Sequence, residues 1–303
     1  MLKYKSFNIE NGFVFKRKVL LTVLILFVLN SCSQTPLIWP EFPLYDFNIS
    51  EMQTLEGDIE NIKQRIVGHY AHYDIVSYED TTTKTPMRTF IISYGFTDFY
   101  FEDGKLMQKD SFVRASQKIN QAMVESKFSD ESVQAIKPRI QEVTLSKDEN
   151  GIVLLHREPT PTLLGIVGDP ELPLSTDSND PNLIDPDGDG HPGVTVQISI
   201  GGFIKGELYI TRREIYENYL TLNSDGSLTG YVIDSSEQFV IDASMKILKQ
   251  ESNNIQHPDP GLNPIILVPI DPSIDTVEEL MEIRNSIFPP EPEFRSQESE
   301  VGR

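Results

Sequence analysis

The segments between residues 65 and 248 constrain the fold most, because they are short runs of β-branched and aromatic residues separated by turn residues. Glu102-Asp103-Gly104-Lys105 is a hairpin turn within one such run. Regular strand spacing with tight turns predicts a mainly β fold with a few short helices, in which an antiparallel meander forms a barrel or a sandwich. The strand-forming runs are RIVGHYAHYDIVSYE, RTFIISYGFTDFYFEDGKLMQ, GIVLLHRE, VTVQISI, GELYITRR, EIYENYLTL, SLTGYVID and EQFVIDASMKIL.

Three helices are predicted in addition to the strands. Ser129 is a suitable N-cap for the second helix, and Pro138 breaks or kinks it. Thr276 and Glu279 form a capping box at the start of the third helix, and two consecutive prolines follow its end. The predicted helices cover residues 51–63, 129–143 and 276–287.

These patterns divide the chain into a signal peptide, a tether, a β domain and a C-terminal part. A lipocalin-like barrel is one form that the β domain can take, because Gly68-His69-Tyr70 resembles the opening of lipocalin-like barrels. The C-terminal part comprises a helix and an acidic tail. The predicted boundaries are 1–31 for the signal peptide, 32–62 for the tether with a short helix, 63–256 for the β domain and 257–303 for the remainder.

The amino terminus has the pattern of a secretory signal. Residues 16–32 read KRKVLLTVLILFVLNSC, in which three positive charges precede an uncharged apolar run from Val19 to Leu29. A helix of this length crosses only about half of the hydrocarbon thickness of a bilayer, so a permanent membrane span is the weaker interpretation. The sequence therefore predicts export.

The end of this signal, Leu29-Asn30-Ser31-Cys32, resembles the lipobox of bacterial lipoproteins. The resemblance implies cleavage before Cys32, a diacylglycerol thioether on its sulfur and an acyl chain such as palmitate on the new amino terminus. Several acyl chains on one residue form a stable membrane anchor. Cys32 is the single cysteine of the chain.

The charge and the residues after Cys32 bear on partners and location. The chain has 26 basic and 46 acidic residues, a net charge of −20, which repels phosphate backbones and excludes nucleic acid as a partner. Ser33-Gln34-Thr35-Pro36 lacks the acidic cluster that accompanies surface export of some bacterial lipoproteins, and no aspartate follows Cys32 directly. By resemblance to that class, we expect an outer-membrane anchor facing the periplasm.

The motif DPDGDG, residues 185–190, predicts a calcium site. Asp185, Asp187 and Asp189 stand at positions one, three and five of a loop, and Gly190 allows a sharp turn at position six. His191 at position seven can add its backbone carbonyl oxygen. Oxygen ligands select a hard cation, and calcium tolerates irregular loop geometry better than magnesium does.

The loop around this motif, residues 177–193, is not an EF-hand. Val196 occupies position twelve, where an EF-hand has a glutamate, and a strand follows in place of a helix. The motif resembles a single unit of the aspartate-rich thrombospondin type-3 repeat. A further ligand is expected from Asp177, Asp180 or Asn182, and the alternative is an acidic turn that binds no ion.

Catalytic motifs are absent from the sequence, which has no Walker loop, HExxH or GxSxG. His69 and His72 are three residues apart, so a strand directs them to opposite faces. Glu207, Tyr209 and Arg213 share one face of a predicted strand, where they line a polar barrel interior or form surface pairs across strands.

The sequence favours a non-enzymatic, calcium-stabilised module of the cell envelope that binds a small molecule, a glycan or a protein. The alternative is an envelope hydrolase that acts on a glycan or a peptide through an unrecognised pair of carboxylates. An apolar barrel cavity favours binding, whereas a cleft with two converging buried carboxylates favours hydrolysis.

Overall fold

The computed structural model describes residues 39–40, 42, 59–80, 82, 86–121, 123–149, 151–249 and 253–294. The predicted signal peptide and the lipobox with Cys32 lie outside these ranges. Residues 39–294 form one compact unit. Of the helices in the described ranges, none has both the length and the apolar character needed to span a bilayer.

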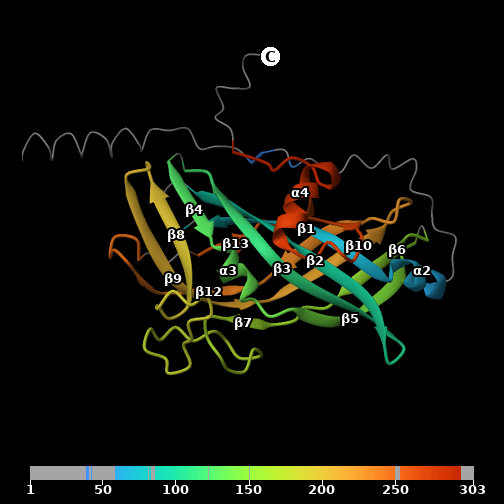
Figure 1. Ribbon diagram of the computed structural model, residues 1–303, viewed down its shortest axis with the longest axis horizontal. Coiled ribbons are helices and arrows are strands. Elements are labelled where there is room, and N and C mark those ends of the chain that lie inside the picture. Colours follow the sequence, from blue (N-terminus) through green and yellow to red (C-terminus); the bar gives the residue numbers. More distant parts are fainter. Residues whose placement is uncertain are drawn as a thin grey trace, which may run out of the picture. The chain divides into compact units, whose positions relative to one another are not determined.

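Eight antiparallel strands form a closed barrel (Figure 1). The predicted fold class, mainly β with an antiparallel barrel and a few short helices, is confirmed. A pairing between the third and fifth strands of the chain closes the ring. Around the ring, the strands are β1 (Gly68–Asp80), β2 (Met87–Glu102), β3 (Lys105–Ile119), β5 (Arg139–Lys147), β6 (Val153–Arg157), β10 (Tyr216–Leu222), β11 (Leu228–Asp234) and β14 (Pro264–Pro269).

A second group of strands extends from β3 as a flanking sheet, seen beside the barrel in Figure 1. Its order from β3 is β4, β8, β9, β12, and β7 also pairs with β9. A short strand, β13, pairs with the end of β1. The bounds are β4 (Val124–Phe128), β7 (Thr162–Leu164), β8 (Val194–Ile200), β9 (Ile204–Glu214), β12 (Glu237–Ala243) and β13 (Ile255–Gln256).

Strand β3 belongs to both the barrel and the flanking sheet because a β-bulge bends it. The register between β2 and β3 shifts at Gly95, leaving Val113 as an extra residue. A Cβ on Gly95 would lie 2.3 Å from the Ser111 carbonyl oxygen, so this close approach requires glycine. Before the bulge β3 pairs with β5, and after it β3 pairs with β4.

The ribbon formed by β9–β10 and β11–β12 also passes from the flanking sheet into the barrel. Only Ile215 separates β9 from β10, and only Ser235 and Ser236 separate β11 from β12. The Ile215 N–H donates to the Ser236 hydroxyl at 2.9 Å, which fixes the bend. The strands predicted as one meander are therefore divided between two sheets.

The predicted helix over residues 129–143 is wrong beyond Gln134. Helix α3 spans Asp130–Gln134, with Ser129 as its N-cap, and β5 begins at Arg139 immediately after Pro138. Proline favours extended backbone in the residue before it and removes a helical donor, and pairing with β3 then favours the strand. Helix α3 covers the part of β3 that lies between the residues paired with β5 and those paired with β4. There Arg114 of β3 and Asp130 of α3 form an ion pair at 2.6 Å.

Two further helices pack on the barrel. Helix α2 (Ile59–Ile66), whose predicted counterpart begins outside the described residues, contributes Ile62 and Ile66 to the apolar interior. Helix α4 (Val277–Ile287) has the predicted capping box and packs with Leu280 on the outer face of β1 and β2. Strand β14 lies between β1 and β11, so the barrel extends past the boundary predicted at 256.

Candidate functional site

The barrel interior is layered along its axis. Alternation along the strands directs even-numbered residues of β1, from Tyr70 to Tyr78, to the interior. One end is apolar and includes Phe99, Leu106 and Leu155 together with the side chains of α2. A polar layer follows, and a cavity lies beyond it towards the flanking sheet.

The polar layer is centred on Asp110, whose side chain is fully buried. Its carboxylate accepts hydrogen bonds from Thr97 at 2.8 Å and from Gln108 at 2.9 Å, and Arg157 Nε lies 3.3 Å away. Burial by itself raises the pKa of Asp110, but Arg157, His72 and Gln108 together hold it below its usual value. This layer is a charge-compensated network inside the barrel.

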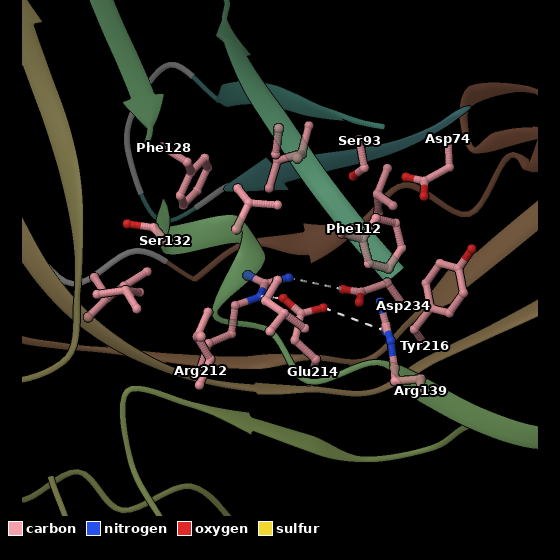
Figure 2. A pocket seen from close by; sticks show the side chains of 18 of the residues that line it. Asp74, Ser93, Phe112, Phe128, Ser132, Arg139, Arg212, Glu214, Tyr216 and Asp234 are labelled. Carbon is pink, nitrogen blue, oxygen red and sulfur yellow. Dashed lines mark hydrogen bonds and ion pairs between the residues drawn. The ribbon is translucent and has the colours of Figure 1, made fainter. Parts of the chain in front are cut away.

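The cavity lies between the bent strand β3, helix α3 and the bend of the β9–β12 ribbon (Figure 2). Its volume is about 80 Å³. One wall is apolar and comprises Phe112, Phe128, Val133, Leu164, Val194 and Ile210. The polar lining comprises Asp74, Tyr78, Ser93, Ser132, Arg139, Arg212, Glu214, Tyr216 and Asp234.

Arg139, the first residue of β5, is the most unusual lining residue. It is only 2% exposed, and its guanidinium carbon lies 4.8 Å from the centre of the Phe112 ring and 4.5 Å from that of Tyr216. Within the described part of the chain, its Nε and Nη1 atoms have no hydrogen-bond partner. The ion pair with Glu214 is long, at 3.8 Å. Two rings thus hold a buried cation with two nitrogen atoms that make no hydrogen bond to the described residues.

The carboxylates beside Arg139 are bound to other groups. Arg212 Nε lies 2.5 Å from Glu214, and Asp234 accepts from Tyr78 at 2.7 Å and from Ser236 at 2.5 Å. Burial raises the pKa of Asp234, and the attraction of Arg212 only partly opposes this. Burial also works to raise the pKa of Glu214, but its ion pair with Arg212 holds it below the usual value.

The hydroxyl of Tyr216 adds a second unused group to the cavity. This oxygen is buried and has no hydrogen-bond partner among the described residues. Burial raises the pKa of Tyr216 well above its usual value, so the hydroxyl keeps its proton and is a donor. Several lining residues are half-buried, among them Ile91, Ser93 and Ala115.

The three aspartates of DPDGDG gather in the structure. Carboxylate oxygens of Asp185, Asp187 and Asp189 all lie within 4.8 Å of one another. Asp187 Oδ2 accepts from Ser132 of α3 and from the Thr195 N–H of β8, both at 2.8 Å. The other oxygen of Asp187 is buried and has no partner among the described residues. The loop is therefore tied to the start of β8 and to a residue that lines the cavity.

The other residues predicted for this site take different positions. Asp185 accepts from the backbone N–H groups of residues 188–190, which turns the loop around its carboxylate. The His191 ring stacks on the Tyr209 ring with 4.1 Å between the centroids, and the backbone N–H of His191 donates to the Asp189 carboxylate. Asp180 accepts from the Asn182 N–H and is not among the three clustered carboxylates.

The two histidines of β1 face opposite sides, as predicted. His69 lies outside the barrel, 2.6 Å from Asp98, whereas His72 lies inside, 2.8 Å from both Thr97 and Asp74. Their rings therefore do not converge on one ion.

Glu207, Tyr209 and Arg213 do not line the barrel interior, because β9 belongs to the flanking sheet. Their strand face carries side-chain pairs, including Tyr209 with Glu207 at 3.1 Å and Arg213 with Glu237 of β12 at 3.4 Å. The opposite face of β9 carries the residues that enter the cavity. Arg213 with Glu237 is a cross-strand pair, as the alternative interpretation predicts, whereas Tyr209 and Glu207 pair within β9.

A second cluster suited to a metal lies on the outer barrel face. His156, Glu158 and Glu217 offer atoms within 4.8 Å of one another. The two glutamates approach different nitrogens of the ring, Nδ1 at 3.5 Å for Glu158 and Nε2 at 3.0 Å for Glu217. This arrangement is that of a histidine bridged between two carboxylates.

Sequence reasoning missed the charged residues of the barrel interior. A signal was present for Arg157, because Val153 and Leu155 share its face in a strand of alternating pattern. A charged residue on an apolar strand face is a candidate for a buried network. No such signal marked Arg139, because its segment was assigned to a helix.

No family model matches the chain, and neither the curated proteins nor the solved structures include a match. What the site can bind is therefore inferred from the geometry of this chain alone.

Proposed function

We propose that this protein is a lipid-anchored, non-enzymatic binding module of the bacterial cell envelope. It holds a small molecule in the cavity between the barrel and the flanking sheet. The observation that carries the proposal is Arg139, a buried cation with unused donors in the cavity lining. Buried donors without acceptors cost free energy, and a ligand that supplies an acceptor recovers it.

Hydrolysis, the alternative function, has one observation in its favour. Glu214 and Asp234 both line the cavity, and their environments shift their pKa values in opposite directions. Both carboxylates, however, already receive charged or hydroxyl donors from the protein. A general acid or base must have a free approach to substrate, so this arrangement favours binding over hydrolysis.

Binding is tested by native mass spectrometry of the mature protein purified from its own envelope fraction. We expect a small-molecule adduct that is lost in Ala115→Trp, because Ala115 lines the cavity and the larger side chain would occupy its space. Ala243→Trp, at the end of β12 and outside the cavity lining, is the matched control and keeps the adduct. Identical spectra for all three proteins would overturn the proposal.

Calcium belongs to the proposal as a structural ion. Asp185, Asp187 and Asp189 would hold it, with the backbone carbonyl of His191 as a further ligand and Asp180 as a more distant one. The donor set suits calcium because it consists of oxygens on a glycine-rich loop. The buried Asp187 oxygen without a partner also supports a cation at this place. By fixing the loop, the ion would fix where β8 begins.

The anchor is the third part of the proposal. Lipidated Cys32 would attach the protein to the outer membrane, facing the periplasm. Cys32→Ala should release the protein from the membrane fraction and abolish labelling by a palmitate analogue. Ser33→Ala, which leaves the thiol intact, should retain both. Unchanged membrane partition of Cys32→Ala would disprove lipid anchoring.

A further inference from the structure

The cavity between the barrel and the flanking sheet is called the junction cavity below. We infer that its ligand is a small carboxylate, which Arg139 and Tyr216 bind while its carbon chain lies on the apolar wall. The inference rests on the proposed binding function and names the chemical class of its ligand. It follows from the kind of hydrogen bond left open in the cavity, from the charge beside it and from the size of the space.

The open hydrogen-bonding positions at the polar end of the cavity are donors. Arg139 contributes Nε and Nη1, and Tyr216 contributes its hydroxyl, all buried and without partners in the described residues. The neighbouring acids Glu214 and Asp234 are already bound by the donors of the protein. A ligand at this end must therefore supply acceptors.

The charge at this position favours an anion over a neutral acceptor. Glu214 is shared between two arginines, and it lies much closer to Arg212, at 2.5 Å, than to Arg139, at 3.8 Å. The other two carboxylates of the lining are also engaged, Asp234 by Tyr78 and Ser236, and Asp74 by His72 at 2.8 Å. The charge of Arg139 is thus incompletely balanced in a buried setting, where charge-assisted hydrogen bonds are strongest.

The cavity is also shaped for a short amphipathic molecule. Its volume of about 80 Å³ holds roughly five to eight groups the size of a water molecule, because one water needs ~10–15 Å³ of such space. Phe112, Phe128 and Val133 provide an apolar surface beside the polar end. Arg139 is held between two aromatic rings, so its donors are oriented before the ligand arrives. A carboxylate with a chain of a few carbons meets all three conditions.

The experiment is isothermal titration calorimetry of the mature protein with acetate, propanoate, butanoate and hexanoate. The neutral and cationic isosteres of butanoate are butanamide, 1-butanol and butylamine. We expect butanoate to bind at least about tenfold more tightly than any isostere, because charge-assisted hydrogen bonds are the strong ones. Affinity should rise with chain length until the apolar wall is covered.

Two variants identify the residues. Arg139→Met keeps a long side chain between the two rings and should weaken butanoate binding at least about tenfold. Tyr216→Phe removes only the hydroxyl and should weaken it about three- to tenfold. Arg114→Gln is the control, because Arg114 pairs with Asp130 and does not line the cavity. If Arg139→Met does not fold, the binding of butanoate to Tyr216→Phe and the comparison of butanoate with its isosteres test the inference.

The outcomes separate this inference from the proposed function. Equal binding of butanoate and butanamide, tighter binding of butylamine, or full affinity in Arg139→Met and Tyr216→Phe would overturn the carboxylate while leaving a binding cavity in place. Tighter butylamine binding would assign the site to Asp74 and a cation. If no probe binds and no adduct is retained, both the inference and the proposed function fail.

Discussion

The polar layer and the junction cavity each hold a buried arginine, and the two arginines differ in how closely the protein compensates their charge. In the polar layer, Arg157 donates through Nη1 to the Tyr216 carbonyl at 2.8 Å and pairs with Asp110 at 3.3 Å, while its Nε and Nη2 atoms have no hydrogen-bond partner among the described residues. In the cavity, Arg139 makes no hydrogen bond with the described residues through Nε or Nη1. Both side chains are at least 98% buried. The difference therefore lies in compensation and not in exposure.

The comparison separates a structural charge from a functional one. A buried ion pair with further hydrogen bonds satisfies its own desolvation and specifies one arrangement of the strands. A buried cation without acceptors costs stability, and the fold retains it where another molecule completes it. The predictions below test this separation, beginning with the largest effect.

Asp110→Asn should destabilise the protein by about 3–5 kcal/mol, because it leaves Arg157 buried without a counter-charge. Urea unfolding at neutral pH measures this loss. Asp98→Asn on the outer face of β2 is a suitable control, since its carboxylate is 36% exposed. A loss below about 1 kcal/mol would show that the polar layer does not depend on the ion pair.

Removal of calcium should act on the junction and spare the polar layer. At a hundred times its dissociation constant, an ion that binds only the folded state adds about 2.7 kcal/mol. Chelation should lower the melting temperature, with calcium restoring it and magnesium doing so poorly, and amide exchange should increase in α3 and β8 more than in β1. Asp187→Ala should abolish the response, while Asp169→Ala, in the same loop region but outside the cluster, should keep it. Identical melting curves with calcium and chelator would remove the ion from the account.

Acid should affect the two regions with opposite signs. The pKa of Asp110 is lowered on folding, so its contribution is present above the unfolded value of 3.8 and is lost as the pH falls through the folded value. The pKa of Asp234 is raised, so its charge is a cost at neutral pH that disappears as the pH falls through its folded value. Relative to wild type, Asp234→Asn should therefore look most favourable at pH 7 and lose that advantage near pH 4. Denaturant unfolding across this range measures it, and a pH-independent difference would contradict the sign.

Arg139→Met should have the smallest effect on stability, from near zero to a slight gain, when no ligand is present. Its removal takes away an incompletely compensated buried charge, and an apolar side chain of similar length preserves the contacts with both rings. The measurement is the same urea unfolding used for Asp110→Asn. A loss of about 3 kcal/mol would place Arg139 in the structural class with Arg157.

Local signals allowed much of the architecture to be predicted. The turn at Asp103-Gly104, where both residues have positive φ, joins β2 and β3 as expected, because glycine and aspartate adopt that conformation readily. The capping box of α4 formed as predicted, because its partners are three residues apart. Regular strand spacing with tight turns predicted an antiparallel barrel or sandwich, and the structure is a barrel.

The candidate site was not predictable in the same way. Arg139 appeared to belong to a helix, and only its pairing with β3 places it inside the barrel. Glu214 and Asp234 are 20 residues apart in the sequence. Both enter the cavity because each lies directly before the bend of the ribbon. The aspartate loop was visible in the sequence, but its contact with Ser132 of the cavity wall was not.

The sequence by itself determined the strands, the turns, the helix caps and the crowding of three carboxylates, because each depends on residues within a few positions of one another. The tertiary structure alone decided which strands share β3, where β14 inserts and which arginine meets a carboxylate. These outcomes depend on pairing between segments far apart in the chain, where several registers satisfy the same alternation. The burial of Arg139 with only a long ion pair to Glu214 is then a property of the assembled barrel, which no single segment contains.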